Sequence, residues 1–320
     1  MRSRTRARVL ILALPLLASC SSKKKSQPIA VEEVPSVRAI KDAPQELMVL
    51  RQVLVEEDST QGVLTLHSKE VAKKLGGLLV TSGYLAARDG DVPDTQHPRR
   101  VEGFLTMSYD WAPEAGALVL AAEARLEFVK GRDDLAPRAA VLMEALVPTA
   151  DAAQQALETL ESNATVALAE TLVAQERLRL APHAELLSAL SIGLHEPSMR
   201  IWALRLAADR SLVEAVPAAM DALEAEDADV QAAAIATLVA LGDPRAVPAL
   251  VKDADFNNYE ELGVRIEAVA AIGGEDAIEF LEFVASGHSN PAIQEQAKSS
   301  LARLRSGVTG GPSVSNRSPL

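Results

Sequence analysis

Small and branched apolar residues recur at helical spacing in the C-terminal part of the chain, and the same face returns four times. The copies begin at equivalent positions, Met199, Val230, Val264 and Ile293. The fourth residue after each is alanine, at Ala203, Ala234, Ala268 and Ala297, and the eighth is Ala207, Leu238, Ile272 and Leu301. Positions i, i+4 and i+8 lie on one side of an α-helix. The pattern therefore predicts four helices that share a narrow apolar seam with small residues in its middle.

The predicted starts of these helices agree with one another. The residues expected at the cap and at the first helical position are Glu196-Pro197, Asp227-Ala228, Glu261-Leu262 and Asn290-Pro291. Asp and Asn accept hydrogen bonds from the free N–H groups of a first helical turn, and proline suits the first helical position because it has no N–H to satisfy.

A second helix is predicted after each of the first ones. The stretch GDPRAVPAL, residues 242–250, places Gly242 as a left-handed cap, Asp243 as the next N-cap and Pro244 at the following helix start. The dipeptides that mark equivalent points of this second helix are Ala215-Val216, Ala246-Val247 and Ala277-Ile278. The chain is therefore expected to fold here as a series of helix pairs.

These helix pairs resemble HEAT repeats, in the short form found in phycobilin-lyase-like (PBS lyase) HEAT proteins. The closest match is DADVQAAAIATLVALGDPRAVPALVKD, residues 227–253, and the resemblance extends over about residues 183–305. It implies a curved stack of helices with an extended surface of the kind that binds proteins. It implies no lyase activity, because no separate catalytic motif accompanies it.

The N-terminal domain, residues 45–180, has a different pattern. Ser68 is expected to cap a helix whose apolar side is Val71, Leu75, Leu78 and Leu79, and which ends at Gly83. A strand is expected to begin at Tyr84, and residues 101–110 and 117–129 alternate as strands do, with a turn between them.

Three further segments complete the reading of this domain. Residues 62–66 are a strand candidate, residues 48–55 fit a strand or a helix, and helical sequence is expected from about residue 135 to residue 180. The predicted fold class is α+β: a small β-α-β-β N-terminal domain followed by an α-solenoid of HEAT-like helix pairs over residues 181–305.

The N-terminus has the layout of a secretory signal peptide. Four arginines precede an apolar run, residues 9–18, which is shorter than the roughly 20 residues that span a bilayer. The run ends in Leu17-Ala18-Ser19-Cys20, which resembles the lipobox of bacterial lipoproteins. The resemblance implies cleavage between Ser19 and Cys20 and a diacylglyceryl group on Cys20, with acyl chains such as palmitate. An ordinary signal peptide with a chance cysteine is the alternative.

The remaining terminal segments are expected to be unstructured. Residues 20–44 are a lipidated cysteine and a flexible tether, and residues 306–320 are a disordered tail rich in Gly, Ser and Pro. Ser21, which follows the cysteine, favours an outer membrane facing the periplasm by resemblance to enterobacterial lipoproteins.

The net charge of the chain limits which kinds of molecule we expect it to bind. The formal net charge is −12, and it becomes about −16 once residues 1–19 are removed. Such a chain repels phosphate backbones, so nucleic-acid binding is not expected. Residues 211–287 hold 16 acidic and 3 basic side chains. This favours a protein partner with a basic or mixed-charge surface, unless the acids only keep an alanine-rich solenoid soluble.

No pattern of catalytic or metal-binding residues is present. The histidines are His67, His97, His183, His195 and His288, none at metal-ligand spacing, and no second cysteine exists to join a metal site. His67 and His97 would meet near Asp94 only if the fold brought them together. The sequence also lacks a nucleophile elbow, a P-loop and a dinucleotide-binding glycine motif. We therefore expect no enzyme, no cofactor and no metal.

The loop before the third repeat copy holds the best candidates for partner contact. Its residues Phe256, Asn257, Asn258 and Tyr259 either form a contact site or fold back to seal the adjacent helices. The predicted function is a membrane-anchored envelope lipoprotein that acts as a protein-binding scaffold. The alternatives are a structural subunit that oligomerises through its α/β domain, and an enzyme with a site in that domain.

Overall fold

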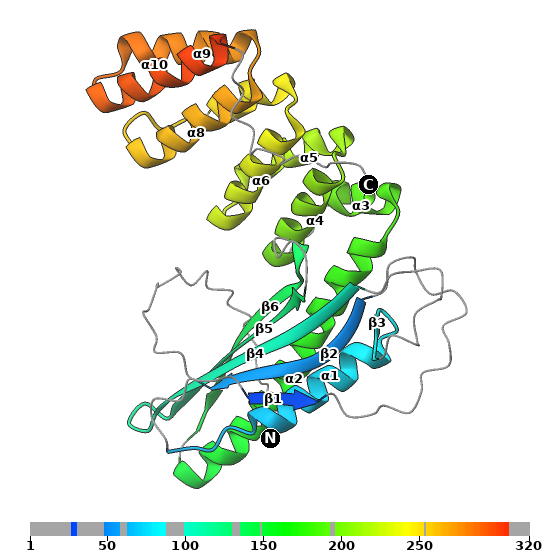
Figure 1. Cartoon of the computed structure of the whole chain (residues 1–320). Coiled ribbons are helices and arrows are strands. Elements are labelled where there is room, and N and C mark those ends of the chain that lie inside the picture. The colour runs from blue at the N-terminus through cyan, green and yellow to red at the C-terminus, as the bar shows by residue number, and fades with distance from the viewer. Residues whose placement is uncertain are drawn as a thin grey trace. The chain divides into compact units, whose positions relative to one another are not determined.

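A computed structural model describes residues 27–30, 48–57, 63–87, 99–129, 135–147, 149–192, 196–252 and 254–306. The chain divides into two compact units, Met1–Ala181 and Pro182–Leu320 (Figure 1). The predicted signal peptide, the cleavage site at Ser19 and Cys20, the two residues Asp94 and His97, His195, and the tail from residue 307 lie outside the described residues.

The first unit is built on a mixed β-sheet with the strand order β1-β2-β4-β5-β6. The strands are β1 Gln27–Ala30, β2 Met48–Glu57, β3 Leu85–Ala86, β4 Arg99–Ala112, β5 Ala117–Phe128 and β6 Arg138–Leu146. β2 and β4 are parallel, and α1 (Ser68–Thr81) lies between them in the sequence. β4, β5 and β6 follow as antiparallel neighbours, and the short β3 pairs with one end of β2.

Helices α1 and α2 (Ala150–Leu180) cover one face of this sheet (Figure 1). The covered face is apolar because alternate residues of the central strands point to it, among them Leu105 and Met107 of β4 and Leu120 of β5, all 0% exposed. Leu79 of α1 and Leu157 of α2 complete this core. Burial of each such side chain is worth about 1.5–3 kcal/mol.

The structure corrects four predictions for this unit. Residues 138–146 are not helical but form β6, and residues 63–66 are not a strand. Ser68 is the first residue of α1 and His67 occupies the N-cap position, without a side-chain cap bond. The predicted flexible tether contains β1, which pairs antiparallel with β2. Residues 48–55, undecided from sequence, belong to strand β2.

The missing strand at residues 63–66 has a physical explanation. Side chains satisfy its backbone instead of a neighbouring strand. The hydroxyl of Tyr109 accepts from the N–H of Leu64 at 2.8 Å and donates to its carbonyl at 3.0 Å. The amide of Gln154 makes the same pair of bonds with the backbone of Thr65, at 2.9 and 3.0 Å.

The second unit is helical, as predicted. Its α-helices are α3 His183–Ile192, α4 Pro197–Asp209, α5 Val216–Asp221, α6 Ala228–Leu241, α7 Val247–Lys252, α8 Tyr259–Ile272, α9 Glu275–Gly287 and α10 Pro291–Arg305. Short 3₁₀ turns, Val213–Ala215 and Pro244–Ala246, lead into α5 and α7. α4, α6, α8 and α10 are the first helices of successive pairs, and Figure 1 shows them in sequence along the unit.

The predicted seam is the core of this unit. Ala203, Ala234 and Ala297 are completely buried and Ala268 is 5% exposed. Small residues at these points let neighbouring helices approach closely, and each pair buries its apolar face on the next.

The predicted caps also agree with the structure at most helix starts. Glu196, Asp227, Asp243 and Asn290 each accept a hydrogen bond from the first helical turn. Gly242 has the left-handed conformation expected of a helix end, with φ of 64°.

The third copy departs from the predicted alignment. α8 begins at Tyr259, and its N-cap is Asn258, whose side chain accepts from the N–H of Glu261. Asn is the better cap, so the helix begins earlier than the alignment with Glu261 predicts. Val264, aligned with the buried residues Val230 and Ile293, is 50% exposed. The seam of α8 is formed by Leu262, Ile266, Ala268 and Val269 instead.

Candidate protein-binding surface

Three aromatic side chains in the second unit gather around a buried histidine. Phe256 and Tyr259 come from the loop and start of α8, and Phe283 comes from α9. The rings of Phe256 and Phe283 meet edge to face with centroids 5.9 Å apart, and Tyr259 meets His288 in the same way at 5.7 Å. Aromatic pairs prefer this geometry. We call Phe256, Tyr259, Phe283 and His288 the aromatic patch.

The patch both seals the fold and faces solvent. His288 is 8% exposed, whereas Phe256, Tyr259 and Phe283 are 37%, 48% and 63% exposed. Phe256 and Tyr259 therefore fold back onto their neighbours, which is the second of the two predicted alternatives, and each ring also keeps a large exposed surface. Contact of these rings with a partner stays a prediction. Large aromatic side chains held rigidly at a surface are typical anchors of protein interfaces.

His288 holds the loop in place through the protein backbone. Its Nε2 lies 2.9 Å from the carbonyl oxygen of Phe256, and its Nδ1 accepts from the N–H of Asn290 at 3.0 Å. A carbonyl oxygen only accepts, so the ring is the neutral tautomer with its proton on Nε2. His288 thus joins the loop before α8 to the start of α10, and presents the Phe256 ring at a defined position.

Acidic residues lie next to the patch residues in the sequence, and one of them, Glu282, is paired with Arg305 of α10. Glu279 and Glu282 precede Phe283 on α9, and Asp255 and Glu260 flank the loop. The predicted loop residues Asn257 and Asn258 are exposed but have structural roles. Asp255 accepts from the N–H of Asn257, and Asn258 caps α8.

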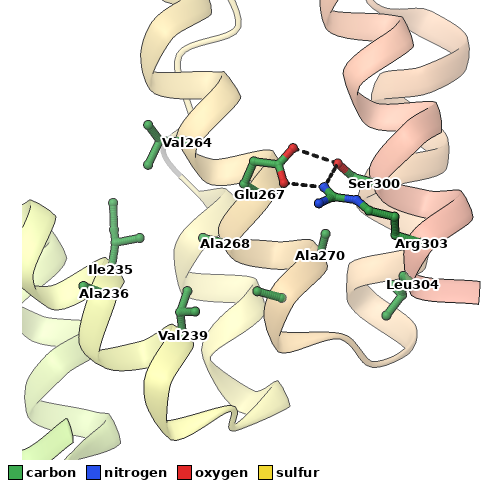
Figure 2. Close-up of a pocket in the computed structure, with 11 residues that line it drawn as sticks. Ile235, Ala236, Val239, Val264, Glu267, Ala268, Ala270, Ser300, Arg303 and Leu304 are labelled. Carbon is green, nitrogen blue, oxygen red and sulfur yellow. Dashed lines mark hydrogen bonds and ion pairs between the residues drawn. The ribbon is translucent and has the colours of Figure 1, made fainter. Parts of the chain in front are cut away.

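A groove of about 310 Å³ runs along α6, α8 and α10, and Figure 2 shows the residues that line it. Its apolar lining comes from α6, α8 and α10: Ile235, Ala236, Val239, Val264, Ala268, Ala270, Ala271 and Leu304. The exposure of Val264 is explained by this position, because its side chain lines the groove and does not enter the seam.

A polar network forms one wall of the groove. Glu267 of α8 accepts from the hydroxyl of Ser300 at 2.9 Å and from the guanidinium of Arg303, both on α10. The amide of Gln296 bridges the same carboxylate and the carbonyl of Gly263. Burial raises the pKa of Glu267, but the hydrogen bonds from Arg303, Ser300 and Gln296 outweigh it and hold the pKa below its ordinary value.

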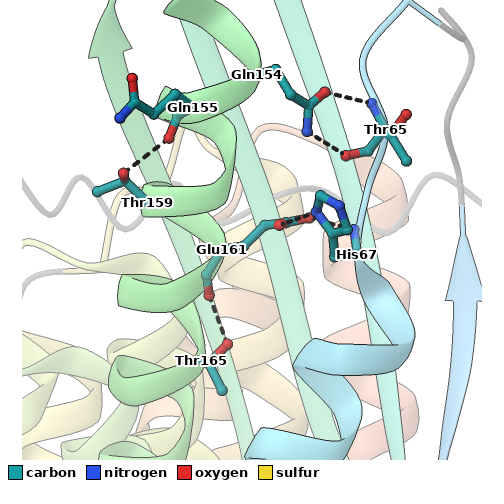
Figure 3. A network of polar contacts seen from close by, with 7 residues as sticks. All are labelled: Thr65, His67, Gln154, Gln155, Thr159, Glu161 and Thr165. Atoms are coloured by element: carbon teal, nitrogen blue, oxygen red, sulfur yellow. Dashed lines mark hydrogen bonds and ion pairs between the residues drawn. The ribbon is translucent and has the colours of Figure 1, made fainter.

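The first unit contains a separate polar network, shown in Figure 3. The carboxylate of Glu161 on α2, 4% exposed, accepts from the backbone N–H of His67 at 2.7 Å and lies 3.1 Å from its Nδ1. The sequence offers His97 and Asp94 only as conceivable neighbours of His67, and both lie outside the described residues. Its contact with Glu161 is not predicted from the sequence. These hydrogen bonds connect the N-terminus of α1 to α2. It does not form a pocket with other titratable groups within the described residues.

The described residues were searched for a membrane-spanning helix and for a metal-binding cluster. Among them, no helix is both long and apolar enough to cross a bilayer. They contain no cluster of three or more His, Cys, Asp or Glu side chains suited to a metal ion.

Comparison with known families gives a match within the helical unit. Residues 184–262 match the family model for HEAT repeats. The matched segment runs from α3 to the start of α8, inside the region that the alanine pattern marks as repetitive. α9 and α10 extend the same helix pairing past it, and α10 adds the fourth buried alanine, Ala297. No curated protein and no solved structure matched the chain.

Proposed function

We propose that this protein is a lipid-anchored scaffold of the bacterial cell envelope that binds another protein through its HEAT-type repeats. The lipobox-like sequence ending in Cys20 supports the anchor, and the repeats support the binding role. The aromatic patch is the observation that carries the proposal, because it joins exposed anchor side chains to a rigid repeat surface.

The lipid gives the protein its location. Each buried CH₂ of an acyl chain contributes about 0.8 kcal/mol, so two or more chains on Cys20 make a stable anchor. Ser21 favours the outer membrane, facing the periplasm. Changing Cys20 to Ser and fractionating the cells tests this anchor, and membrane association that persists in Cys20→Ser would remove it from the proposal.

The partner is a protein whose contact surface combines basic and apolar side chains. The acidic side chains around the aromatic patch would attract the basic groups and speed association, while the rings would supply most of the affinity. The groove lined by α6, α8 and α10 offers a second apolar surface on the same unit.

A pull-down from membranes tests this binding role. The native lipoprotein is crosslinked in cells, purified, and compared with a double variant, Phe256→Ala with Phe283→Ala. The matched control is Val213→Ala, which truncates an apolar side chain of similar exposure, 44%, outside the patch. The proposal predicts that a protein recovered with the native chain and the control is lost with the double variant. Equal recovery from all three chains would contradict it.

A further inference from the structure

β6 forms one edge of the sheet, and its hydrogen bonds show which of its residues face outward. The N–H of Leu126 donates to the carbonyl of Pro137, and the N–H of Val147 donates to the carbonyl of Gly116. In an antiparallel pair the residues that bond to the neighbour alternate with residues that do not. The odd-numbered residues of this segment therefore bond to β5, and the even-numbered ones direct their N–H and C=O groups away from the sheet.

One end of this edge is closed by a side chain. The amide of Gln175 on α2 accepts from the N–H of Arg138 at 2.8 Å and donates to its carbonyl at 2.7 Å. The next outward residues are Ala140, Leu142, Glu144 and Leu146, and no hydrogen bond to their outward groups is found in the described part of the chain. After them the sequence places Pro148, which has no N–H to offer.

The open part of the edge is unusually apolar. Residues 140–146 read AVLMEAL, with Glu144 as the single charge. Leu146 is 89% exposed, more than any other large apolar side chain of the described residues. Natural sheets protect exposed edges with lysine, proline or bulges, because a bare edge pairs with other strands. This stretch has none of these within it.

We propose that residues 140–146 pair antiparallel with the same residues of a second copy, joining two sheets into one. A two-fold axis at Met143 sets Ala140 opposite Leu146 and Leu142 opposite Glu144 of the second copy. Every outward N–H and C=O between the Gln175 closure and Pro148 then finds a partner. The same surface serves both copies, as two-fold symmetry requires. The proposal depends on the sheet edge alone and not on the repeat surface.

The register predicts one distinctive contact. Met143 would face Met143 of the second copy as a pair without mutual hydrogen bonds, with Cα atoms about 4.5 Å apart. That separation suits a disulfide, which needs roughly 4.4–6.8 Å. Val141 would instead lie opposite Ala145 of the second copy, so two Val141 residues would be about four residues, or roughly 14 Å, apart along the strands.

Single cysteines introduced into the full chain test this register. Cys20→Ser removes the one native cysteine, and Met143→Cys or Val141→Cys is added. Under mild oxidation most of the Met143→Cys protein is expected to become a disulfide-linked dimer. The Val141→Cys protein is expected to form little or no such dimer. Dimer from Val141→Cys but not from Met143→Cys would overturn the proposed pairing.

Oligomeric state provides the second test. The detergent-purified full chain is expected to have twice the mass of one chain, and Leu142→Pro to have the mass of one. An edge strand tolerates proline at a residue whose N–H points away from the sheet, as that of Leu142 does, so Leu142→Pro should still fold. Leu142→Ala keeps the N–H and is expected to stay dimeric, and circular dichroism checks that both variants fold. A native chain that is monomeric at all concentrations, or a Leu142→Pro chain that folds and stays dimeric, would overturn the proposal. If the edge instead binds a strand of a different protein, the purified native chain would be monomeric at all concentrations, which is the first of the two overturning results.

Discussion

The carboxylate of Glu161 accepts the backbone N–H of His67, a residue 94 positions earlier, at 2.7 Å. This bond supplies from α2 the cap that the start of α1 does not make for itself. A carboxylate is well placed there, because the N-terminus of a helix carries a partial positive charge. The pair holds together the two helices that cover the sheet.

Removal of this carboxylate is predicted to destabilise the first unit. Glu161→Ala leaves a partly buried N–H without its acceptor, which costs about 1–3 kcal/mol. Glu158→Ala, the same change at an exposed position of α2, should stay within about 0.5 kcal/mol of the native chain. Urea unfolding followed by Trp111 fluorescence in a Trp202→Phe background reports on this unit, because each unit holds one of the two tryptophans. Equal midpoints for the two variants would contradict the capping role.

The left-handed cap Gly242 is predicted to tolerate asparagine better than alanine. A Cβ at this glycine would meet nothing within 4 Å, so the cost of Gly242→Ala is conformational and amounts to about 1–2 kcal/mol. Gly242→Asn should cost less, because asparagine adopts this conformation more readily.

Gly287→Ala is the matched control for this prediction. Its Cβ also meets open space, but its φ is not positive and it lies within α9. It should leave the unit as stable as the native chain or slightly more stable. Trp202 fluorescence in a Trp111→Phe background measures the unfolding midpoints, and a Gly242→Ala midpoint no lower than that of Gly287→Ala would refute this account.

The Glu267 network predicts a loss of stability in acid. Because the folded-state pKa of Glu267 lies below its ordinary value of 4.5, its contribution is present above that value. The contribution is lost as the pH falls through the folded-state pKa. Its size at neutral pH should be modest, about 0.5–1 kcal/mol, since Glu267 and Arg303 remain 45% and 48% exposed.

Comparison with Glu267→Gln tests this dependence. The native chain should be the more stable of the two at pH 7, and the difference should shrink between about pH 5 and pH 3. Glu279→Gln, at an exposed glutamate of α9, should show a smaller difference at every pH. Unfolding curves of the second unit at several pH values provide the measurement, and a difference that grows in acid would have the wrong sign.

The repeat architecture could be predicted because it depends on local pattern. The buried alanines, the caps Asp227 and Asp243 and the glycine at 242 are each a short-range signal, and each has the predicted place. β6 could not be predicted in the same way. Its residues Ala, Leu, Met and Glu favour helices, and pairing with β5 outweighs that preference.

The candidate surface was half visible in the sequence. The sequence indicates Phe256 and Tyr259 because they are aromatic residues in a predicted loop. Phe283 was missed because its neighbours come together only in the folded unit. The helical spacing does hold one indication. The buried side of α9 is formed by Ala277, Leu281 and Val284, and Phe283 does not fall on that side. His288 gave no signal, because its two backbone partners depend on the loop conformation.

The most direct test concerns the proposed contact between the aromatic patch and another protein of the envelope. A photo-crosslinking amino acid placed at Phe283, with the same group at Val213 as the control, measures this contact in intact cells. The account predicts one crosslinked protein, with a basic or mixed-charge surface, from position 283. The crosslink should be weak or absent at position 213 and should be lost when Phe256→Ala is added. The same crosslinks from both positions, or none from position 283, would contradict it.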